Sequence, residues 1–519
     1  MVGLVGDARR LVKGNRKTSM HESGKSDGPV VPAKRANKGT AAAEPAECVE
    51  ERGLTKGKTG QQNASGTQSP KHDASSALNR LREAAKRDRK AKFTALLHHV
   101  TIEKLTASFY ALKRRAASGV DGVTWEMYRE ELEANIVDLH ARVHRGAYRA
   151  KPSRRVTIPK ANGGERPLGI ASLEDKIVQR AMTDVLNAIY EVDFIGFSYG
   201  FRPGRGQHQA LDAVAVGIQR KNVNWVLDAD IRGFFDAIDH EWMRKFIEHR
   251  IGDPRVVRLI QKWLSAGVLE NGKRAVGKVG SPQGATISPL LANVYLHYTF
   301  DLWAEQWRRR HARGDMIIVR YADDIVVGFQ HEQEARRFWA AMAERLQNFG
   351  LELHPDKTRL LEFGRHARRN REKRGEGQPE AFDFLGFTHR CGESKKNGWF
   401  RVERQTIKQR LRTTLKRISD ALRRNRHRSI PEQGKWLGQV IRGYCAYHAV
   451  PLNMRLMNVF RNQVIRLWIK WLRRRSQKHA LPWPRMQRLV RLFIPSVRVM
   501  HPWPSKRFDV RTQGRSPVR

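Results

Sequence analysis

The chain has 519 residues, with 98 lysines and arginines against 52 aspartates and glutamates, giving a formal net charge of +46. A surplus that large repels itself unless a polyanion neutralises it, which favours nucleic acid as the partner over an anionic membrane. The three cysteines form no CxxC pair and no apolar run reaches membrane-spanning length, which argues against a zinc finger, a disulfide framework and a membrane protein. The scattered cysteines fit a reducing cytosol, and the N-terminus carries no long apolar segment, so we expect no secretory signal.

The N-terminal part divides into an arm and a helical segment. Residues 1–75 are rich in Gly, Ser, Ala, Lys and Pro and nearly free of aromatics, which predicts a disordered basic arm. Helical spacing of apolar residues begins near Ser76. Thr101 is expected to cap a helix running to residue 117, and a second helix is expected over 125–143.

A β-hairpin is predicted over residues 154–170, where two short apolar strands flank the turn Asn162-Gly163-Gly164. Lys160 and Arg166 flank the turn and could both reach one anionic ligand. A solvated basic hairpin without a ligand is the alternative reading.

Farther along, a long helix is expected over 173–190, followed by a glycine-punctuated loop over 197–205 with exposed arginines. Residues 224–231 alternate like a strand. The apolar face carries Trp225, Leu227, Ala229 and Ile231, and the acidic face carries Asp228 and Asp230. This strand is expected to lead into a helix ending near residue 250.

A turn over 280–284 precedes a helix predicted from Ser288 towards Trp307, with a proline in its first turn. The segment Arg320–Phe329 then reads as strand, tight turn and strand, with Asp323 and Asp324 at the tip. Adjacent carboxylates repel unless a cation sits beside them, and a divalent cation is the usual remedy. A solvated turn is the alternative. A helix over 332–349, closed by a glycine, follows.

The final third is basic and helical. An apolar stripe at helical spacing runs over 407–422, and further helices are expected over 433–449 and 453–474. The last 40 or so residues, rich in Pro, Trp and Arg, are expected to lie extended on another surface.

Asp230 and the Asp323–Asp324 turn could meet side by side in an antiparallel sheet. Three carboxylates would then hold two Mg²⁺ ions about 3.5–4 Å apart, the spacing used for in-line phosphoryl displacement. Nucleotidyl transfer follows as the expected chemistry, with Lys160 and Arg166 supplying positive charge to the triphosphate.

The order of blocks resembles the reverse transcriptases of group II introns, the intron-encoded maturases. The blocks are Arg166–Gly169, Phe197–Arg202, Asp230–Asp236, Ser281–Gly284 with Ile287–Asn293, Tyr321–Asp324, Phe384–Phe387 and Ile441–Tyr444. Any one tetrapeptide is weakly specific, but seven blocks in the right order are a strong signal. The resemblance covers the chain from about residue 76 to its end.

The resemblance implies an α+β right-hand polymerase fold. Its parts would be a disordered arm over 1–75, fingers and palm with an antiparallel sheet over 76–390, a helical thumb or maturase domain over 391–480, and a basic tail over 481–519 that contacts DNA.

The resemblance also implies roles for single residues. Asp230, Asp323 and Asp324 would be the catalytic metal ligands for two Mg²⁺ ions. Phe235 would lie under the incoming sugar and reject a 2′-hydroxyl, with a core phenylalanine as the alternative. Lys160, Arg166, Ile231 and Gln283 would complete the dNTP site, and Tyr321 and Lys357 would contact primer or template.

The function implied is RNA-directed DNA synthesis together with intron RNA binding that assists splicing and intron mobility. The partners would be intron RNA, target DNA and dNTPs, with no membrane, and a homodimer stays open. A bacterial cytoplasmic or nucleoid-associated ribonucleoprotein is the expected location. No paired-cysteine nuclease module follows the maturase block. The alternatives are a splicing-only maturase and a domesticated retron or defence reverse transcriptase.

Overall fold

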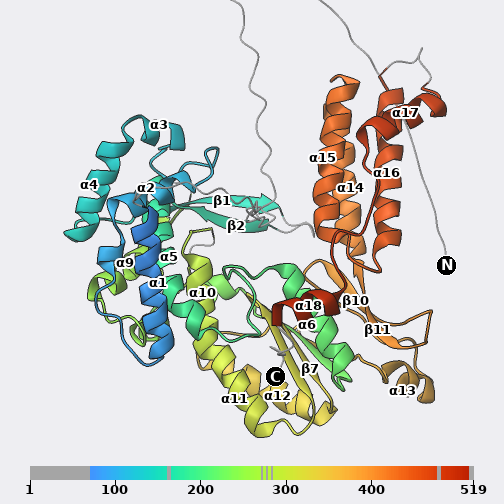
Figure 1. Cartoon of the computed structure of the whole chain (residues 1–519), viewed down its shortest axis with the longest axis horizontal. Coiled ribbons are helices and arrows are strands. Elements are labelled where there is room, and N and C mark those ends of the chain that lie inside the picture. Colours follow the sequence, from blue (N-terminus) through green and yellow to red (C-terminus); the bar gives the residue numbers. More distant parts are fainter. Residues whose placement is uncertain are drawn as a thin grey trace, which may run out of the picture. The chain divides into compact units, whose positions relative to one another are not determined.

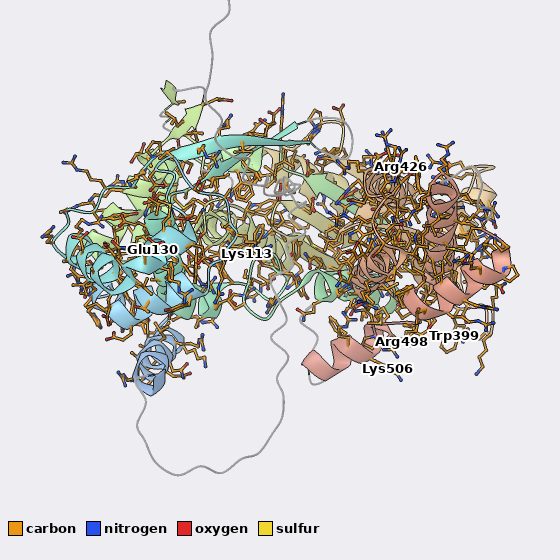
Figure 2. All side chains as sticks on the ribbon, turned by 90° about the horizontal axis from the view of Figure 1, so that it is seen from above. Lys113, Glu130, Trp399, Arg426, Arg498 and Lys506 are labelled. Atoms are coloured by element: carbon orange, nitrogen blue, oxygen red, sulfur yellow. The ribbon has the colours of Figure 1, made fainter. Side chains whose placement is uncertain are left out.

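The computed structural model describes residues 71–159, 165–270, 273–275, 277, 279–281, 284–475 and 481–512, all within one compact unit that begins at Asn63. Helices and three sheets alternate along it, confirming the α+β class (Figure 1). Charged side chains such as Arg426 and Lys506 stand out from its surface (Figure 2). None of the helices described is long and apolar enough to cross a membrane. The predicted arm over 1–75 lies outside the described residues up to residue 70, and the prediction is wrong for residues 71–75, which begin helix α1.

The N-terminal helices are α1 (Lys71–Arg87), α2 (Ile102–Tyr110), α3 (Trp125–Glu130), α4 (Leu132–His144) and α5 (Leu173–Asp193), with a 3₁₀ turn at Leu97–His99. Thr101 caps α2 as predicted, because its side chain accepts from the backbone N–H of Lys104 at 3.2 Å.

The helix predicted to reach residue 117 ends at Tyr110. The carbonyl of Phe109 accepts from the indole N–H of Trp125 at 3.3 Å and from the backbone N–H of Leu112 at 3.0 Å, so it is not available to continue the helix. The helix expected over 125–143 is likewise two helices, divided at Glu131.

The predicted hairpin is confirmed as β1 (Ser153–Pro159) and β2 (Glu165–Ile170), with Val156 opposite Leu168. It belongs to a sheet ordered β2-β1-β4-β5, in which β4 is Val268–Glu270 and β5 is Lys273–Ala275. The turn residues 160–164 lie outside the part of the chain that the structure describes.

The central sheet is ordered β6-β7-β3-β8 and is antiparallel. Its strands are β3 (Trp225–Asp230), β6 (Met316–Tyr321), β7 (Asp324–Phe329) and β8 (Arg359–Glu362). Leu227 and Val327 point into the larger core, whereas Val226 and Val326 point into a second core on the opposite face, against α6 (Gln207–Arg220). Both faces are therefore covered, and only the strand ends are left for a site.

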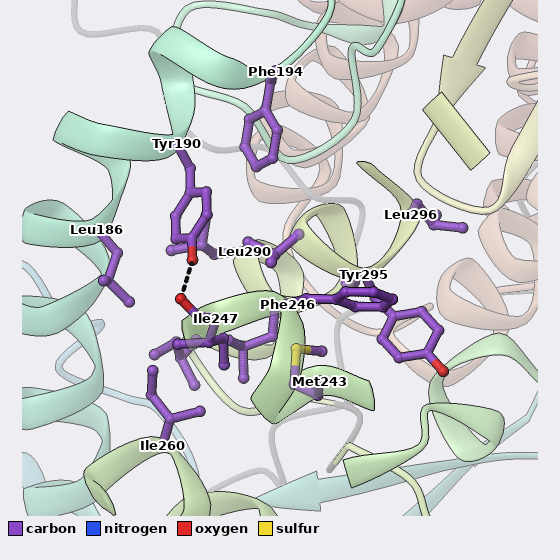
Figure 3. Close-up of a cluster of buried hydrophobic side chains, with 14 of the residues drawn as sticks. Leu186, Tyr190, Phe194, Met243, Phe246, Ile247, Ile260, Leu290, Tyr295 and Leu296 are labelled. Carbon is purple, nitrogen blue, oxygen red and sulfur yellow. Dashed lines mark hydrogen bonds between the residues drawn. The ribbon is translucent and has the colours of Figure 1, made fainter. Parts of the chain in front are cut away.

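The larger core collects side chains from helices on both sides of β3 in sequence. Figure 3 shows Tyr190 of α5, whose hydroxyl donates to the carbonyl of Ile247 at 3.5 Å, and Phe246, whose ring meets Tyr295 edge-on at 5.3 Å. The helices around this core are α7 (Phe234–Ala237), α8 (His240–Glu248), α9 (Pro254–Ser265), α10 (Ser288–Leu296), α11 (Leu302–His311) and α12 (Glu332–Gln347).

Two single-helix predictions in this region need correction. The helix predicted after β3 and ending near residue 250 is two helices, α7 and α8, because Ile238 adopts an extended conformation and Asp239 caps the second helix. The helix predicted from Ser288 contains a π-helical turn at His297–Asp301 between α10 and α11.

The C-terminal helical region packs α14 (Lys408–Arg424), α15 (Ile430–His448), α16 (Met454–Arg473) and α17 (Trp483–Phe493) around a third core. Between it and the central sheet lie α13 (Ala367–Lys373) and a small sheet of β9 (Phe382–Phe384), β10 (Phe387–Glu393) and β11 (Phe400–Thr406). The predicted stripe is confirmed, with Ile418 and Leu422 buried.

The extended tail predicted for the last 40 residues is wrong for the described part, which holds α17 and α18 (Pro504–Thr512). α18 packs on α6 (Figure 1), where the buried carboxylate of Asp212 pairs with Arg404 at 2.8 Å and with Arg507 at 3.1 Å. The C-terminal segment thus returns to the central sheet instead of lying extended.

Candidate active site

Three carboxylates meet at one end of the central sheet. In the register of β3 and β7, Asp230 lies directly opposite Asp324, and Asp324 lies opposite Tyr321 of β6. Asp323 occupies the two-residue turn between β6 and β7, where Ala322 adopts a positive φ of 55°. Positive φ is what the tightest hairpins require, so the turn is short enough to hold both carboxylates at the tip. The predicted meeting of these residues is confirmed at the level of the backbone.

The electrostatics of this cluster favour a cation. Burial, together with the negative charges of Asp323, Asp230 and Asp228, raises the pKa of Asp324 to about 7. Burial also raises the pKa of Asp228 to about 7. Asp324 and Asp228 are therefore costly to ionise, so bound positive charge would stabilise their charged forms.

Two side chains of the chain itself already supply positive charge. The Lys357 ammonium lies 2.6 Å from a carboxylate oxygen of Asp230, and the Arg359 guanidinium lies 3.7 Å from Asp228. Lys357 was predicted to contact primer or template, and the structure places its ammonium beside Asp230. Asp228 was assigned to the acidic face but to no role, although its alternation with Asp230 was visible in the sequence.

Among the described residues, no three His, Cys, Asp or Glu side chains already stand in metal-coordinating geometry. The donor set nonetheless suits a hard divalent cation, because Mg²⁺ prefers one or two carboxylates and fills its remaining positions with water and substrate phosphates. Asp230, Asp323 and Asp324 are the residues that would hold it.

Arg320, near the end of β6, stabilises the β6–β7 hairpin and is completely buried. Its Nε and Nη2 donate to the two carboxylate oxygens of Asp301 at 2.7 and 2.6 Å. Its remaining N–H groups donate to the side chains of Asn293 and Ser198 and to the carbonyl of Ala322, at 3.1, 2.7 and 3.0 Å. All five guanidinium N–H groups are satisfied, and one of them holds the turn itself.

The loop over 197–205 packs directly under the same turn. A Cβ at Gly200 would lie 2.3 Å from the backbone nitrogen of Ala322, so only glycine fits. Asn293 donates to the Gly200 carbonyl at 2.7 Å. The sequence prediction of exposed arginines in this loop is wrong for Arg202, which is buried and pairs with Glu191 at 3.1 Å.

Phe235 and Ile231 have different environments. Phe235 is half-buried, packs against the larger core, and accepts from the backbone N–H of Ser281 at 2.7 Å through its carbonyl. Its ring is partly buried against the core and partly exposed, so its burial alone does not decide between a packing role and a nucleotide contact. The side chain of Ile231 is only 2% exposed in the larger core, which leaves only its main chain for any nucleotide contact.

The remaining predicted nucleotide contacts are not described. Lys160 and Gln283 lie outside the described residues. For Arg166, in β2, the structure gives only the backbone, which lies opposite Ile158 of β1. Sequence reasoning missed Ser198, Asn293 and Asp301. Ser198 and Asn293 lie inside blocks that the sequence singled out, but nothing in the sequence indicates that they converge on Arg320.

A family model described as reverse transcriptase (RNA-dependent DNA polymerase) matches residues 158–389, the span from β1 to β10. That span contains all three carboxylates and Arg320. The match therefore coincides with the fold elements that build the site.

Curated proteins also match part of the chain. Protein YkfC of Escherichia coli K12 is 36% identical over 276 residues, which cover 47% of this chain and 71% of that protein. Group II intron-encoded protein LtrA of Lactococcus lactis subsp. cremoris is 38% identical over 191 residues, covering 37% of this chain and 31% of LtrA. An uncharacterized 91 kDa protein in the cob intron of Schizosaccharomyces pombe is 44% identical over 146 residues, covering 28% and 18%. The chain thus spans less than a third of the last two proteins.

We predict that Arg320→Met destabilises the fold by about 3–5 kcal/mol, because it leaves the buried Asp301 carboxylate without its partner. The free energy of unfolding from denaturant titration measures this.

The matched control is the double variant Arg320→Met with Asp301→Leu. Replacing both charges by apolar groups should recover part of the lost stability, because the buried charge is gone but Asn293, Ser198 and the Ala322 carbonyl still lose their donor. If the single variant unfolds at the same denaturant concentration as the parent, the buried pair does not support the hairpin.

Proposed function

The chain belongs to the reverse transcriptases encoded by group II introns, and from that premise we propose that its carboxylate cluster catalyses addition of dNTPs to a primer on an RNA template. The observation that carries the proposal is the register of β3 and β7, which sets Asp230 opposite Asp324 with Asp323 beside them. Bound Mg²⁺, as two ions, would lower the pKa of the primer 3′-hydroxyl and neutralise the triphosphate and its leaving group.

The chain's own groups then position the reactants. Lys357, 2.6 Å from Asp230, gives the cluster a cation that can move to a phosphate oxygen or primer end. Phe235, five positions after Asp230 in the chain, presents a half-buried ring that can exclude a 2′-hydroxyl from the incoming sugar. Tyr321, opposite Asp324, would contact the primer or template. Lys160, Arg166, Gln283 and the main chain of Ile231 complete the proposed dNTP site.

We assign residues 76–390 to fingers and palm and 391–480 to a thumb or maturase domain. The support is the division of buried side chains, since α14, α15 and α16 share a core of their own. Exposed cations follow the outside of α14, including Arg412, Lys416 and Arg423. Such a surface suits phosphates of a folded RNA, which proteins recognise mostly by shape and exposed loops.

The second proposed activity is therefore assistance to splicing of the intron RNA that encodes the chain, with intron mobility into target DNA. In that role the basic segment over 481–519 would contact DNA. The protein would work in a bacterial cytoplasmic or nucleoid-associated ribonucleoprotein, with a homodimer as one arrangement. A splicing-only maturase is the alternative function, and the cluster of ionisable carboxylates weighs against it, because RNA binding alone needs no such repulsion.

We predict that Asp323→Asn lowers primer extension on an RNA template by at least roughly 100-fold, because it removes charge that stabilises the transition state through the metal. Extension of oligo(dT) on poly(rA) with Mg²⁺ measures it, and binding of the intron RNA by the same variant is the control. Extension at parental rates would exclude Asp323 from the metal site, whereas an inactive parent protein would favour the splicing-only alternative.

We predict that Phe235→Ala weakens discrimination against rNTPs by about 10-fold or more, because the space for a 2′-hydroxyl opens. Single-nucleotide incorporation with paired dNTP and rNTP measures the ratio. Phe235→Tyr keeps the ring and should keep the discrimination. An unchanged ratio in the alanine variant would identify Phe235 as a packing residue only.

We predict that the triple variant Arg412→Ala, Lys416→Ala and Arg423→Ala binds intron RNA more weakly and with less dependence on salt. Each lost phosphate contact lowers the slope of log affinity against log salt concentration by about 0.7–0.9. The three together should lower it by roughly 2. Filter binding over a salt series measures the slope.

The matched control removes three exposed arginines from the palm helices α11 and α12, namely Arg309, Arg336 and Arg337. Both triple variants lose the same formal charge, so a general electrostatic effect would weaken both equally. That equality would contradict a specific RNA surface on α14.

A further inference from the structure

A hydrogen bond joins the C-terminal helical region to a turn at the edge of the acidic face. The hydroxyl of Tyr447, in the last turn of α15, donates to the backbone carbonyl of Leu385 at 2.7 Å. Leu385 and Gly386 form the two-residue turn between β9 and β10, in which Phe384 pairs with Phe387. The side chains of Tyr447 and Leu385 both pack against the second core, whereas Leu437, Ile441 and Cys445 earlier in α15 belong to the third core. The end of α15 therefore joins the helical region to the turn.

The turn is conformationally strained. Leu385 has a φ of 46° and Gly386 a φ of 83°, the left-handed region that tight two-residue hairpins require. Glycine adopts it freely, but a leucine there is held against its own preference by its surroundings. A contact that fixes the Leu385 carbonyl is the kind of restraint that keeps such a turn in place.

Two more contacts reach the turn from α14 and the residue before it. A Cβ at Gly386 would lie 3.0 Å from the Arg410 guanidinium and 3.5 Å from the Tyr447 ring. The backbone N–H of Ile407 donates to the Gly386 carbonyl at 3.3 Å. The start of α14 and the end of α15 thus close on the turn from the helical side.

The turn also borders the carboxylate cluster. The negative charge of Asp383, in β9, helps to raise the pKa of Asp228 on the acidic face. Asp324 is close enough to Tyr447 to contribute to its raised pKa. Leu385 and Tyr447 also pack against the same core as Tyr321, which lies opposite Asp324, so the turn and Tyr447 lie on the carboxylate side of the sheet.

We propose that Tyr447 is a positioning residue, whose hydroxyl holds the strained Leu385–Gly386 turn beside the carboxylates and so couples placement of the helical region to seating of the primer end. The inference rests on the proposed polymerase function for its kinetic consequence. Tyr447 takes no part in the chemical step. Its contribution is to keep one turn in the conformation that accepts the primer–template.

The test is Tyr447→Phe, assayed by primer extension over a range of primer–template concentrations. Loss of one neutral hydrogen bond should raise the KM for primer–template by roughly 2- to 10-fold, with kcat changed less than about 2-fold. The matched control is Tyr295→Phe, which removes an equal bond of 2.7 Å to the carbonyl of Phe349, within the larger core. Equal KM values for the two variants would overturn the proposal.

A second variant separates the strain from a general loss of stability. In Leu385→Gly the turn keeps its positive φ without strain and no longer needs the Tyr447 hydrogen bond. Adding Tyr447→Phe to this variant should therefore change the KM for primer–template less than about 2-fold. An undiminished effect of Tyr447→Phe in that background would also overturn the proposal.

Amide hydrogen exchange tests whether the Tyr447 hydroxyl holds the turn, without any activity assay. Exchange at residues 384–388 should rise in Tyr447→Phe and not in Tyr295→Phe. Unchanged exchange would show that the Tyr447 hydroxyl does not hold the turn, which contradicts the proposal. Raised exchange in a protein that extends no primer would count against the polymerase function, but not against the role of Tyr447 in holding the turn.

Discussion

The buried ion pair between Arg320 and Asp301 is the constraint on which the carboxylate-bearing end of the central sheet depends. Both side chains are fully buried, and burying two charges costs several kcal/mol per ion unless each is fully hydrogen-bonded. Here that condition is met by groups from the loop over 197–205, from α10 and from the hairpin turn. Because one guanidinium joins all of them, the turn that carries Asp323 has little freedom to move relative to α10 and the loop over 197–205.

Much of this was predictable from local patterns. The alternation around Asp230, the hairpin with Asp323 at its tip and the apolar stripe of α14 each depend on a spacing that the sequence displays directly. The cluster of carboxylates also followed, because strand ends in one antiparallel sheet come together. These predictions succeeded where a single element or a single pairing decides the outcome.

The errors arose where a distant partner decides. Arg202 was expected in solvent, but Glu191 and nearby carbonyls bury it. The helix after Thr101 stops early because Trp125 takes a carbonyl that the helix would need. The tail folds into α18 because Asp212 offers a buried carboxylate to Arg507. In each case the contact that determines the structure joins two residues whose pairing cannot be read from the spacing of residues in one segment. The same holds for Tyr447 and Leu385, 62 positions apart.

The central claim is that Asp230, Asp323 and Asp324 form one divalent-cation site at the end of the central sheet. Fe²⁺ in place of Mg²⁺, with ascorbate and peroxide, cuts the backbone next to a bound metal, so the cleavage positions report the site. The account predicts cuts near residue 230 and near residues 322–324 together, suppressed by excess Mg²⁺ and lost in Asp323→Asn. Cleavage at only one of these segments, or cleavage that Mg²⁺ does not suppress, would contradict it.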